Sequence, residues 1–288
     1  MLDEVIASAV AEMGVDWASL SDANKLKVVK LLNQRRHVWE RRLFYRMFPD
    51  TDLKVAPDPI MYPDGLIFAR DKYKKQLEFF RAGATHPQRC FMAANRVGKT
   101  IAGAYEVTAH LIGDYPHWWE GRRFNDQIHA WAAGKKNETT RDIVQAILLG
   151  KVLRDGQRKT VSGTGMVPGD LIRLDTITWK QGVADLVDTV EIKHVPSGKH
   201  SVLGFKAYEQ GRGAFEGTAQ HVIWPDEEPP SDVHEEMLMR LTTTKGIMLI
   251  TFTPLEGISD VVLKFLPADY QPAGGERARH QHQTMEMA

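Results

Sequence analysis

The chain has 288 residues, of which 43% are hydrophobic and 26% are charged, and this is typical of a globular protein with one large α/β domain or two small ones. It has 37 basic and 37 acidic side chains, so its zero net charge excludes a protein that binds nucleic acid over its whole surface. No apolar run reaches the roughly 18 residues of a membrane span, the acidic N-terminus is unlike a signal peptide, and the single cysteine, Cys90, excludes an internal disulfide.

The first 65 residues predict a small helical region followed by a connector. Residues 2–13 predict a short helix, and Ser21 is the expected N-cap of a longer helix that Pro49 ends. The second half of this longer helix is basic, which indicates either a contact with DNA or a partner, or a solvated helix face. Its arginines are Arg35, Arg36, Arg41, Arg42 and Arg46. Residues 49–65 are rich in proline and predict an irregular connector.

From residue 66 onward, short apolar runs alternate with amphipathic segments. The runs predict strands at 88–94, 128–134, 221–224 and 246–252, and the amphipathic segments predict helices at 100–112, 137–150 and 232–241. The helix over 137–150 is expected to start with Asn137 as its cap and to end at Gly150, and a hairpin is expected around 195–200. This alternation predicts an α/β domain over 66–270, with a mainly parallel sheet covered on both faces, and a loose tail over 271–288.

The sequence AANRVGKT at 93–100 lies between a predicted buried strand and a predicted helix, which is the context of a phosphate-binding loop. Backbone N–H groups at the start of such a helix converge on one anion, and the helix dipole favours negative charge there. In this arrangement Lys99 reaches the β- and γ-phosphates, and the Thr100 hydroxyl binds Mg²⁺. Ala93 stands where the usual pattern has glycine, and alanine suffices if its φ stays negative. The alternative is a strand-to-helix turn that contains G-K-T by chance.

A second acidic element supports the nucleotide interpretation. The apolar strand 221–224 is followed by Asp226, Glu227 and Glu228, and an acid at the end of such a strand holds the metal of a phosphate-loop ATPase. Glu227 is the candidate that aims the attacking water, and Glu228 is its rival. A solvated acidic turn is the alternative. Together the two elements predict Mg²⁺-dependent ATP hydrolysis.

These motifs, with YEQGRGAFEGTAQHVIWPDEEPP and GIMLITFTPLEG, resemble the ATPase domain of the large terminase subunit of tailed bacteriophages, over about residues 70–265. The resemblance implies a P-loop NTPase fold of the ASCE type and a motor that uses ATP to move double-stranded DNA into a procapsid. It further implies a pentameric ring on the portal protein and a small terminase subunit that selects the DNA. The expected location is the host cytoplasm and transiently the procapsid, and not the mature virion or a membrane.

The resemblance also implies roles for individual residues. The ATP-binding set would be Gln76, Ala93, Ala94, Asn95, Arg96, Val97, Gly98, Lys99 and Thr100. Gln76 would read the adenine, although an ordinary exposed glutamine is the alternative, and Arg96 would contact or sense phosphate beside the catalytic Lys99 and Glu227. Thr100 and Asp226 would hold the metal. Thr251, Thr253 and Pro254 would form the coupling motif, which transmits the state of the γ-phosphate.

Three further arginines are weaker candidates, and one departure from the family stands out. Arg141, Arg212 and Arg240 are candidates for an arginine that acts on a neighbouring subunit or senses ligand, and ordinary ion pairs or a loop position are the alternatives. Terminase large subunits usually continue into a nuclease domain, for which the residues after 265 offer too few acids, so no nuclease activity is expected from them. Another DNA-dependent translocase, or a nucleotide-binding protein without hydrolysis, stays open as an alternative function.

Overall fold

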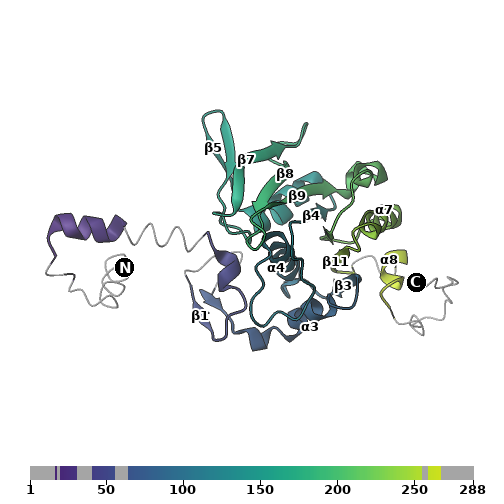
Figure 1. The fold of residues 1–288 in the computed structure, drawn as a ribbon, viewed down its shortest axis with the longest axis horizontal. Helices are drawn as coiled ribbons and strands as arrows, with labels where there is room; N and C mark the ends of the chain where they lie inside the picture. Colours follow the sequence, from purple (N-terminus) through teal and green to yellow (C-terminus); the bar gives the residue numbers. More distant parts are fainter. Residues whose placement is uncertain (1–16, 18–19, 31–40, 56–63, 255–258, 267–288) are drawn as a thin grey trace.

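The computed structural model describes residues 17, 20–30, 41–55, 64–254 and 259–266. Its centre is a seven-stranded sheet with the strand order β3-β11-β10-β4-β9-β8-β7 (Figure 1). The strands are β3 (Gln88–Met92), β4 (His129–Gly134), β7 (Ile172–Trp179), β8 (Val187–Lys193), β9 (His200–Ala207), β10 (Val222–Pro225) and β11 (Ile247–Phe252). Neighbouring strands from β3 to β9 are parallel, whereas β8 and β7 continue the sheet in antiparallel fashion.

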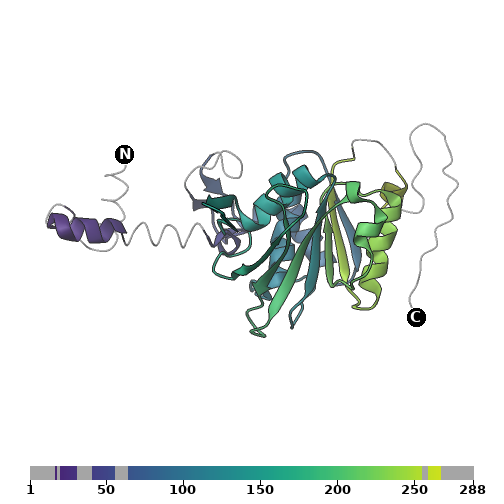
Figure 2. The ribbon, with the colours of Figure 1, turned by 90° about the horizontal axis from the view of Figure 1, so that it is seen from above.

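Helices cover both faces of this sheet (Figure 2). The main helices are α3 (Lys74–Ala82), α4 (Lys99–Ile112), α6 (Ala146–Leu149), α7 (Ser231–Thr242) and α8 (Asp260–Leu263). Short 3₁₀ segments are η2 (Leu43–Arg46), η3 (Arg70–Lys72), η5 (Tyr208–Gln210) and η6 (Arg212–Phe215). Two small antiparallel pairs, β1 (Leu53–Lys54) with β2 (Leu66–Ile67) and β5 (Val152–Asp155) with β6 (Arg158–Val161), complete the described elements.

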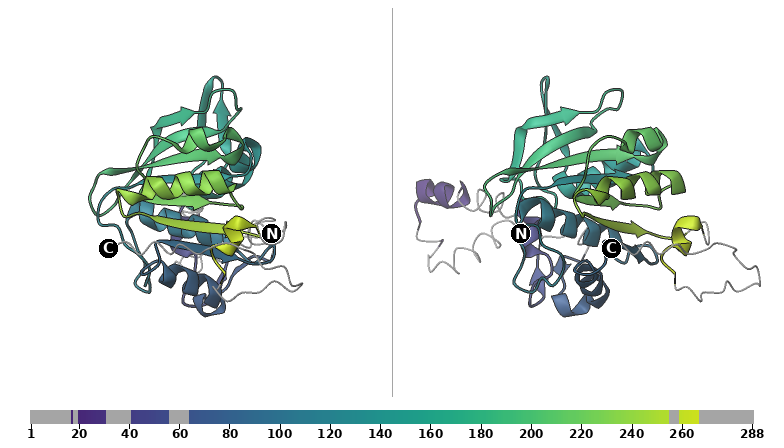
Figure 3. Two further views of the ribbon diagram at one scale, coloured as in Figure 1. Left: turned by 90° about the vertical axis from the view of Figure 1, so that its right-hand side faces the viewer. Right: turned by 45° about the vertical axis from the view of Figure 1, so that its right-hand side comes forward.

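Alternate side chains of the central strands enter two separate cores. Ile247 and Leu249 of β11 pack in the core that includes α4, whereas Met248 and Ile250 pack in the core that includes α7. Because successive strand residues point to opposite faces, this division shows that α4 and α7 lie on opposite sides of the sheet (Figure 3). The expectation of a mainly parallel α/β sheet with helices on both faces is therefore confirmed.

Helix α4 lies unusually close to strand β10. A Cβ atom on Gly103 would come within 2.4 Å of the Trp224 indole nitrogen, so only glycine permits this approach. Glycine also terminates the helix at each end, because Gly98 and Gly113 both have positive φ. The helix that follows the predicted phosphate loop is therefore held against the strand that carries the predicted acids.

The segment before residue 66 joins the same core. Leu43, Phe44 and Phe48 are buried, and the Phe44 ring stacks on Tyr105 of α4 with ring centroids 4.6 Å apart. Strand β1 also pairs with β2 across the expected boundary at residue 65. Where the ATPase domain begins therefore stays a prediction, as do its end at 270 and the tail beyond.

The predicted long N-terminal helix is observed in part. Residues 22–30 are helical, and the backbone N–H of Asn24 donates to the Ser21 hydroxyl at 3.4 Å, as expected for an N-cap. Residues 43–46 form a 3₁₀ segment rather than the last turns of an α-helix. In the basic run, Arg42 pairs with Asp170 at 2.7 Å, whereas the expected helix at 2–13, Arg35, Arg36 and the tail lie outside the described residues.

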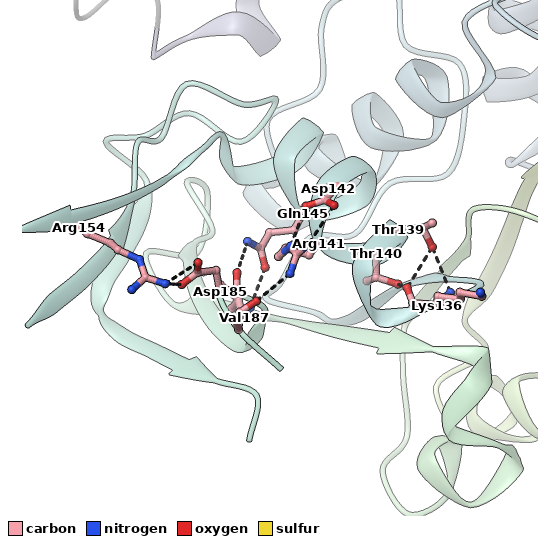
Figure 4. A network of polar contacts seen from close by, with 10 residues as sticks. Lys136, Thr139, Thr140, Arg141, Asp142, Gln145, Arg154, Asp185 and Val187 are labelled. Atoms are coloured by element: carbon pink, nitrogen blue, oxygen red, sulfur yellow. Dashed lines mark hydrogen bonds and ion pairs between the residues drawn. The ribbon is translucent and has the colours of Figure 1, made fainter. Parts of the chain in front are cut away.

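The helix expected over 137–150 differs from its prediction at its start and in its middle. Lys136 is the N-cap, because the backbone and side-chain nitrogens of Asn137 both donate to Glu209 instead. The helix then passes from α5 (Asn137–Thr139) through the π-helical segment η4 (Thr140–Gln145) into α6 and ends at Gly150 as predicted. The Thr140 hydroxyl donates to the Lys136 carbonyl at 2.8 Å beside this π segment (Figure 4).

Candidate nucleotide-binding site

The predicted site residues gather at the carboxyl ends of β3, β10 and β11. These strands are neighbours in the order β3-β11-β10, so the loop after β3 and the acids after β10 both flank the end of β11. Asp226 forms an isolated parallel bridge with Thr251, which brings the acidic segment directly beside the threonine of β11. A crevice outside the carboxyl ends of parallel strands is the usual place for a ligand in an α/β fold.

The loop over 93–98 has the backbone that an anion site requires. Gly98 has a φ of 82° and caps the 14-residue helix α4, and Arg96 has a φ of 61°. Residues in this left-handed region turn successive N–H groups toward one side, which favours an anion at the start of the helix. Ala93 is not among the residues of positive φ, so its side chain is compatible with the loop as expected.

Lys99 and Thr100 begin the helix and point back toward the loop and the acids. The Lys99 ammonium donates to the Ala94 carbonyl at 2.6 Å and is nearly buried. Burial lowers the pKa of Lys99, and the nearby Asp226 and Glu227 oppose this effect. The ammonium therefore lies within the loop, where a bound phosphate would replace its carbonyl partner.

Asp226 is held by a buried chain of hydrogen bonds. The Thr100 hydroxyl donates to its carboxylate at 3.1 Å, and the Thr251 hydroxyl donates to the same carboxylate at 2.7 Å. Thr251 in turn accepts a hydrogen bond from the Trp224 indole at 2.8 Å. Burial raises the pKa of Asp226 to about 6, although the hydrogen bonds from the two threonines lower it. A carboxylate beside a threonine hydroxyl is a donor set suited to Mg²⁺, and phosphate oxygens would complete it.

Glu227 and Glu228 differ sharply in their surroundings. Glu227 is exposed and has a φ of 84°, and no hydrogen bond or ion pair holds its side chain among the described residues. The Glu228 carboxylate instead accepts a hydrogen bond from the Ser259 hydroxyl, which caps α8. The structure thus leaves the Glu227 carboxylate available to a water molecule and engages that of Glu228.

Gln76 lies at the other side of the loop, in helix α3. Its side-chain nitrogen donates to the Val97 carbonyl at 2.9 Å, and the side chain is only 9% exposed. Gln76 also lines a cavity of about 380 Å³ beside the loop. The other lining residues are Lys72, Lys74, Lys75, Phe91, Ala93 and Val97. The structure therefore places Gln76 at a cavity that adjoins the loop and not at an exposed helix surface.

The end of β11 contacts the loop as well as the acids. The Thr253 hydroxyl donates to the Asn95 side-chain oxygen at 2.8 Å, and the backbone N–H of Glu227 donates to the Thr251 carbonyl at 2.8 Å. Pro254 follows Thr253 as the last described residue of this segment. One strand end therefore connects the phosphate loop to the segment of Glu227.

The candidate arginines have different environments. Arg96 is exposed at the loop and has no hydrogen bond or ion pair with another described residue. Arg141 forms two hydrogen bonds with Asp142, at 2.7 and 3.0 Å (Figure 4). Arg212 and Arg240 both pair with the buried Glu236, at 3.0 and 2.8 Å. Arg96 is therefore the arginine whose guanidinium is available at the loop.

Tyr208 belongs to this site although no sequence pattern identified it. Its hydroxyl donates to the Glu227 carbonyl at 2.9 Å and lies 3.3 Å from the Asp226 carbonyl. Tyr208 directly follows strand β9, so the only sequence signal for it is its place at the end of a strand that neighbours β4. A rule that examines every polar residue at a carboxyl strand end would have included it.

Comparison with known proteins gives one consistent result. The sequence profile of the family described as "Terminase large subunit, T4likevirus-type, N-terminal" matches residues 90–281. The large terminase subunit of Salmonella phage P22 is 34% identical over 267 residues, which are 86% of this chain and 47% of that protein. The chain thus spans about half the length of this curated relative.

Solved structures with the same description resemble the chain only loosely. An ATPase-domain variant of the large terminase of Thermus phage P74-26 is 14% identical, covers 63% of this chain and 68% of its own, and has a TM-score of 0.38. The large terminase of a thermophilic bacteriophage in complex with ADP is 15% identical, covers 63% of this chain and 38% of its own, and also has a TM-score of 0.38. No argument below depends on these two structures.

Proposed function

Because the chain belongs to the terminase large subunit family, we propose that it hydrolyses ATP with Mg²⁺ and that this reaction moves double-stranded viral DNA into a procapsid. The observation that carries the proposal is the position of Asp226, whose carboxylate is held between Thr100 of the loop helix and Thr251 of β11. This geometry joins the three elements that a phosphate-loop ATPase requires: an anion site, a metal-binding acid and a strand that connects them.

In this proposal the loop holds the triphosphate. The backbone N–H groups from Asn95 to Gly98 and the Lys99 ammonium bind the β- and γ-phosphates. Thr100 and Asp226 hold the metal ion, which neutralises charge that develops on the phosphates. Arg96, exposed beside them, contacts phosphate and responds to its loss. No metal or nucleotide geometry is needed for this assignment, because each side chain already lies at the loop.

Glu227 aims the water that attacks the γ-phosphate. Its carboxylate is free of partners among the described residues, whereas that of Glu228 bonds to Ser259. Gln76 reads the adenine, since it lines the cavity beside the loop and already donates to the Val97 carbonyl. Its side-chain oxygen and second N–H then remain for the base edge.

The end of β11 transmits the state of the γ-phosphate. Thr253 contacts Asn95 in the loop, and Thr251 contacts both Asp226 and the backbone of Glu227. A change at the phosphate loop would therefore reach Thr253 and Pro254 through direct hydrogen bonds. We propose this segment as the start of the coupling to DNA.

The proposed partners are those of a packaging motor. They are double-stranded DNA, the portal protein, a small terminase subunit and further copies of this chain in a pentameric ring. The neutral net charge supports a DNA surface that is built by several subunits rather than by one. The proposed location is the host cytoplasm and, during packaging, the procapsid; none of the described helices is long and apolar enough to span a membrane.

Phosphate release from ATP tests the proposal directly. We expect turnover that requires Mg²⁺, stops with a chelator, rises with double-stranded DNA and is slower with GTP than with ATP. Equal turnover with ATP and GTP would remove the proposed role of Gln76 alone. Failure of the chain to bind ATP at all, measured by equilibrium binding, would contradict the proposed function.

We expect the Mg²⁺ requirement to depend on pH through Asp226. Burial raises the pKa of this carboxyl group to about 6, and only its ionised form binds the metal. The Mg²⁺ concentration needed for half-maximal turnover should therefore increase as the pH falls through about 6. Thr251→Val removes a hydrogen bond that lowers this pKa, so the midpoint should move to higher pH.

Turnover measured against Mg²⁺ concentration from about pH 5 to about pH 8 checks this expectation. Thr253→Val is the matched control, because this hydroxyl lies on the same strand end but bonds to Asn95 instead of Asp226. Its midpoint should equal that of the unchanged chain. A midpoint that moves equally in both variants would contradict the assignment to Asp226.

A further inference from the structure

The backbone of Glu227 adopts a conformation that this residue does not favour. Its φ of 84° lies in the left-handed region, which glycine adopts freely and other residues rarely adopt. Residues in such regions persist when the surrounding structure holds them, and they cluster at functional sites. The direction of the Glu227 side chain is set by this backbone, because its carboxylate has no partner among the described residues.

Two hydrogen bonds hold the peptide groups on either side of Glu227. Its N–H donates to the Thr251 carbonyl at 2.8 Å, and its carbonyl accepts from the Tyr208 hydroxyl at 2.9 Å. The same hydroxyl lies 3.3 Å from the Asp226 carbonyl and 3.5 Å from the Ala133 carbonyl. Thr251 acts from the strand on one side, and Tyr208 acts from the segment that follows β9.

We infer that Tyr208 is a positioning residue for hydrolysis, whose hydroxyl holds the Glu227 backbone in the left-handed conformation that directs the carboxylate to the attacking water. This inference rests on the proposed function, because it assigns to Tyr208 an effect on the catalytic glutamate. It adds a residue from the β9 side of the sheet, outside the loop, the acidic segment and the strand end that the sequence motifs identify.

The Tyr208 hydroxyl is suited to this task because it stays protonated. Burial raises its pKa well above the ordinary value, and the negative charges of Asp226 and Glu227 raise it further. A protonated phenol donates one hydrogen bond, and the carbonyl groups around it are acceptors only. The direction of the hydrogen bond to Glu227 is therefore fixed over the whole range in which the protein is folded.

The ring of Tyr208 is also fixed in place. The next residue, Glu209, accepts two hydrogen bonds from Asn137, and Gln210 accepts one from the Lys180 ammonium at 2.8 Å. The ring itself lies in the core that contains Phe215 and the α7 side chains. The hydroxyl consequently has a defined position against which the Glu227 carbonyl can be held.

Tyr208→Phe tests the inference because it removes the hydroxyl and keeps the buried ring. We expect turnover to fall about tenfold with ATP affinity unchanged, because the carboxylate is misdirected while the loop is intact. Tyr115→Phe is the matched control: this hydroxyl also bonds to a backbone group, the Phe124 N–H at 2.8 Å, but it lies away from the acids. Turnover of this control should stay that of the unchanged chain.

Two further measurements separate positioning from a purely structural role. In the Glu227→Gln background, Tyr208→Phe should lower the residual turnover no further, since the hydroxyl acts through the carboxylate. Amide hydrogen exchange over residues 225–228 should accelerate in Tyr208→Phe and not in Tyr115→Phe. Unchanged exchange in Tyr208→Phe overturns the inference whether or not the chain turns over ATP.

The outcomes also distinguish this inference from its premise. If Glu227→Gln abolishes turnover while Tyr208→Phe retains it, the inference is wrong and the proposed function stands. If Glu227→Gln retains turnover, the role of Glu227 is wrong and the inference fails with it. A fall of turnover in Tyr208→Phe by the same factor with and without the Glu227 carboxylate would also overturn the inference.

Discussion

Glu227→Gln should lower ATP turnover by about 10²- to 10³-fold and leave ATP affinity nearly unchanged. The amide keeps the size of the side chain but cannot accept a proton from the attacking water. Binding should survive because the loop, Lys99 and the metal-binding Asp226 are separate from the Glu227 side chain, which has no partner among the described residues. Single-turnover hydrolysis and equilibrium ATP binding, measured on the same preparation, would show the two effects separately.

Glu228→Gln is the matched control because it makes the same chemical change one residue along the chain. The Glu228 carboxylate bonds to the Ser259 hydroxyl, so its loss should affect the start of α8 rather than the water. We expect turnover within about threefold of the unchanged chain, the size of one weakened neutral hydrogen bond. The opposite pattern, with Glu228→Gln inactive and Glu227→Gln active, would move the catalytic role to Glu228.

Arg89→Leu should destabilise the fold by about 3–5 kcal/mol, because it leaves the buried Glu106 carboxylate without its cation. Arg89 in β3 forms an ion pair with Glu106 of α4, and these side chains are 6% and 0% exposed. Its guanidinium also donates to the Phe79 carbonyl of α3 at 3.0 Å. Burial opposes the charge of Glu106, but Arg89 and His110 more than compensate and lower its pKa. Chemical denaturation would measure the loss.

Arg81→Leu is the control for this change. Arg81 pairs with Glu120, but these side chains are 63% and 60% exposed, so water and salt screen the pair. Exposed pairs contribute less than about 1 kcal/mol, and the free energy of unfolding should change by no more than that. Equal losses in the two variants would show that burial does not determine the contribution of the Arg89–Glu106 pair.

The sequence predicted the elements of this domain well because each carries a local signal. Strand β11 is a continuous apolar run, and the loop before α4 contains Gly98 at the position where a left-handed residue is needed. The α/β fold with helices on both faces followed from the alternation of such elements. The insertion of β11 between β3 and β10 could not be read from the residues themselves, because strand order depends on contacts between distant segments.

The contacts inside the site were less predictable for the same reason. Asn95 and Thr253 are joined by a hydrogen bond across 158 positions, and Tyr208 contacts Glu227 from a segment that no motif marks. Asn137 was expected to cap its own helix, but Glu209 binds its donors, and only the folded arrangement of β4 and β9 brings these two together. Local patterns indicate which residues are polar at strand ends, and tertiary structure decides which of them meet.

The contact between Gly103 and Trp224 has a mechanical consequence. Because no Cβ separates α4 from β10, the helix has no room to slide or tilt on the strand without colliding with the indole. The helix and the strand therefore move as one rigid body, and the distance between Thr100 and Asp226 is preserved during any larger motion of the domain. We expect any stroke of this protein to arise from rotation about the chain beyond Thr253, with the nucleotide grip kept stiff throughout.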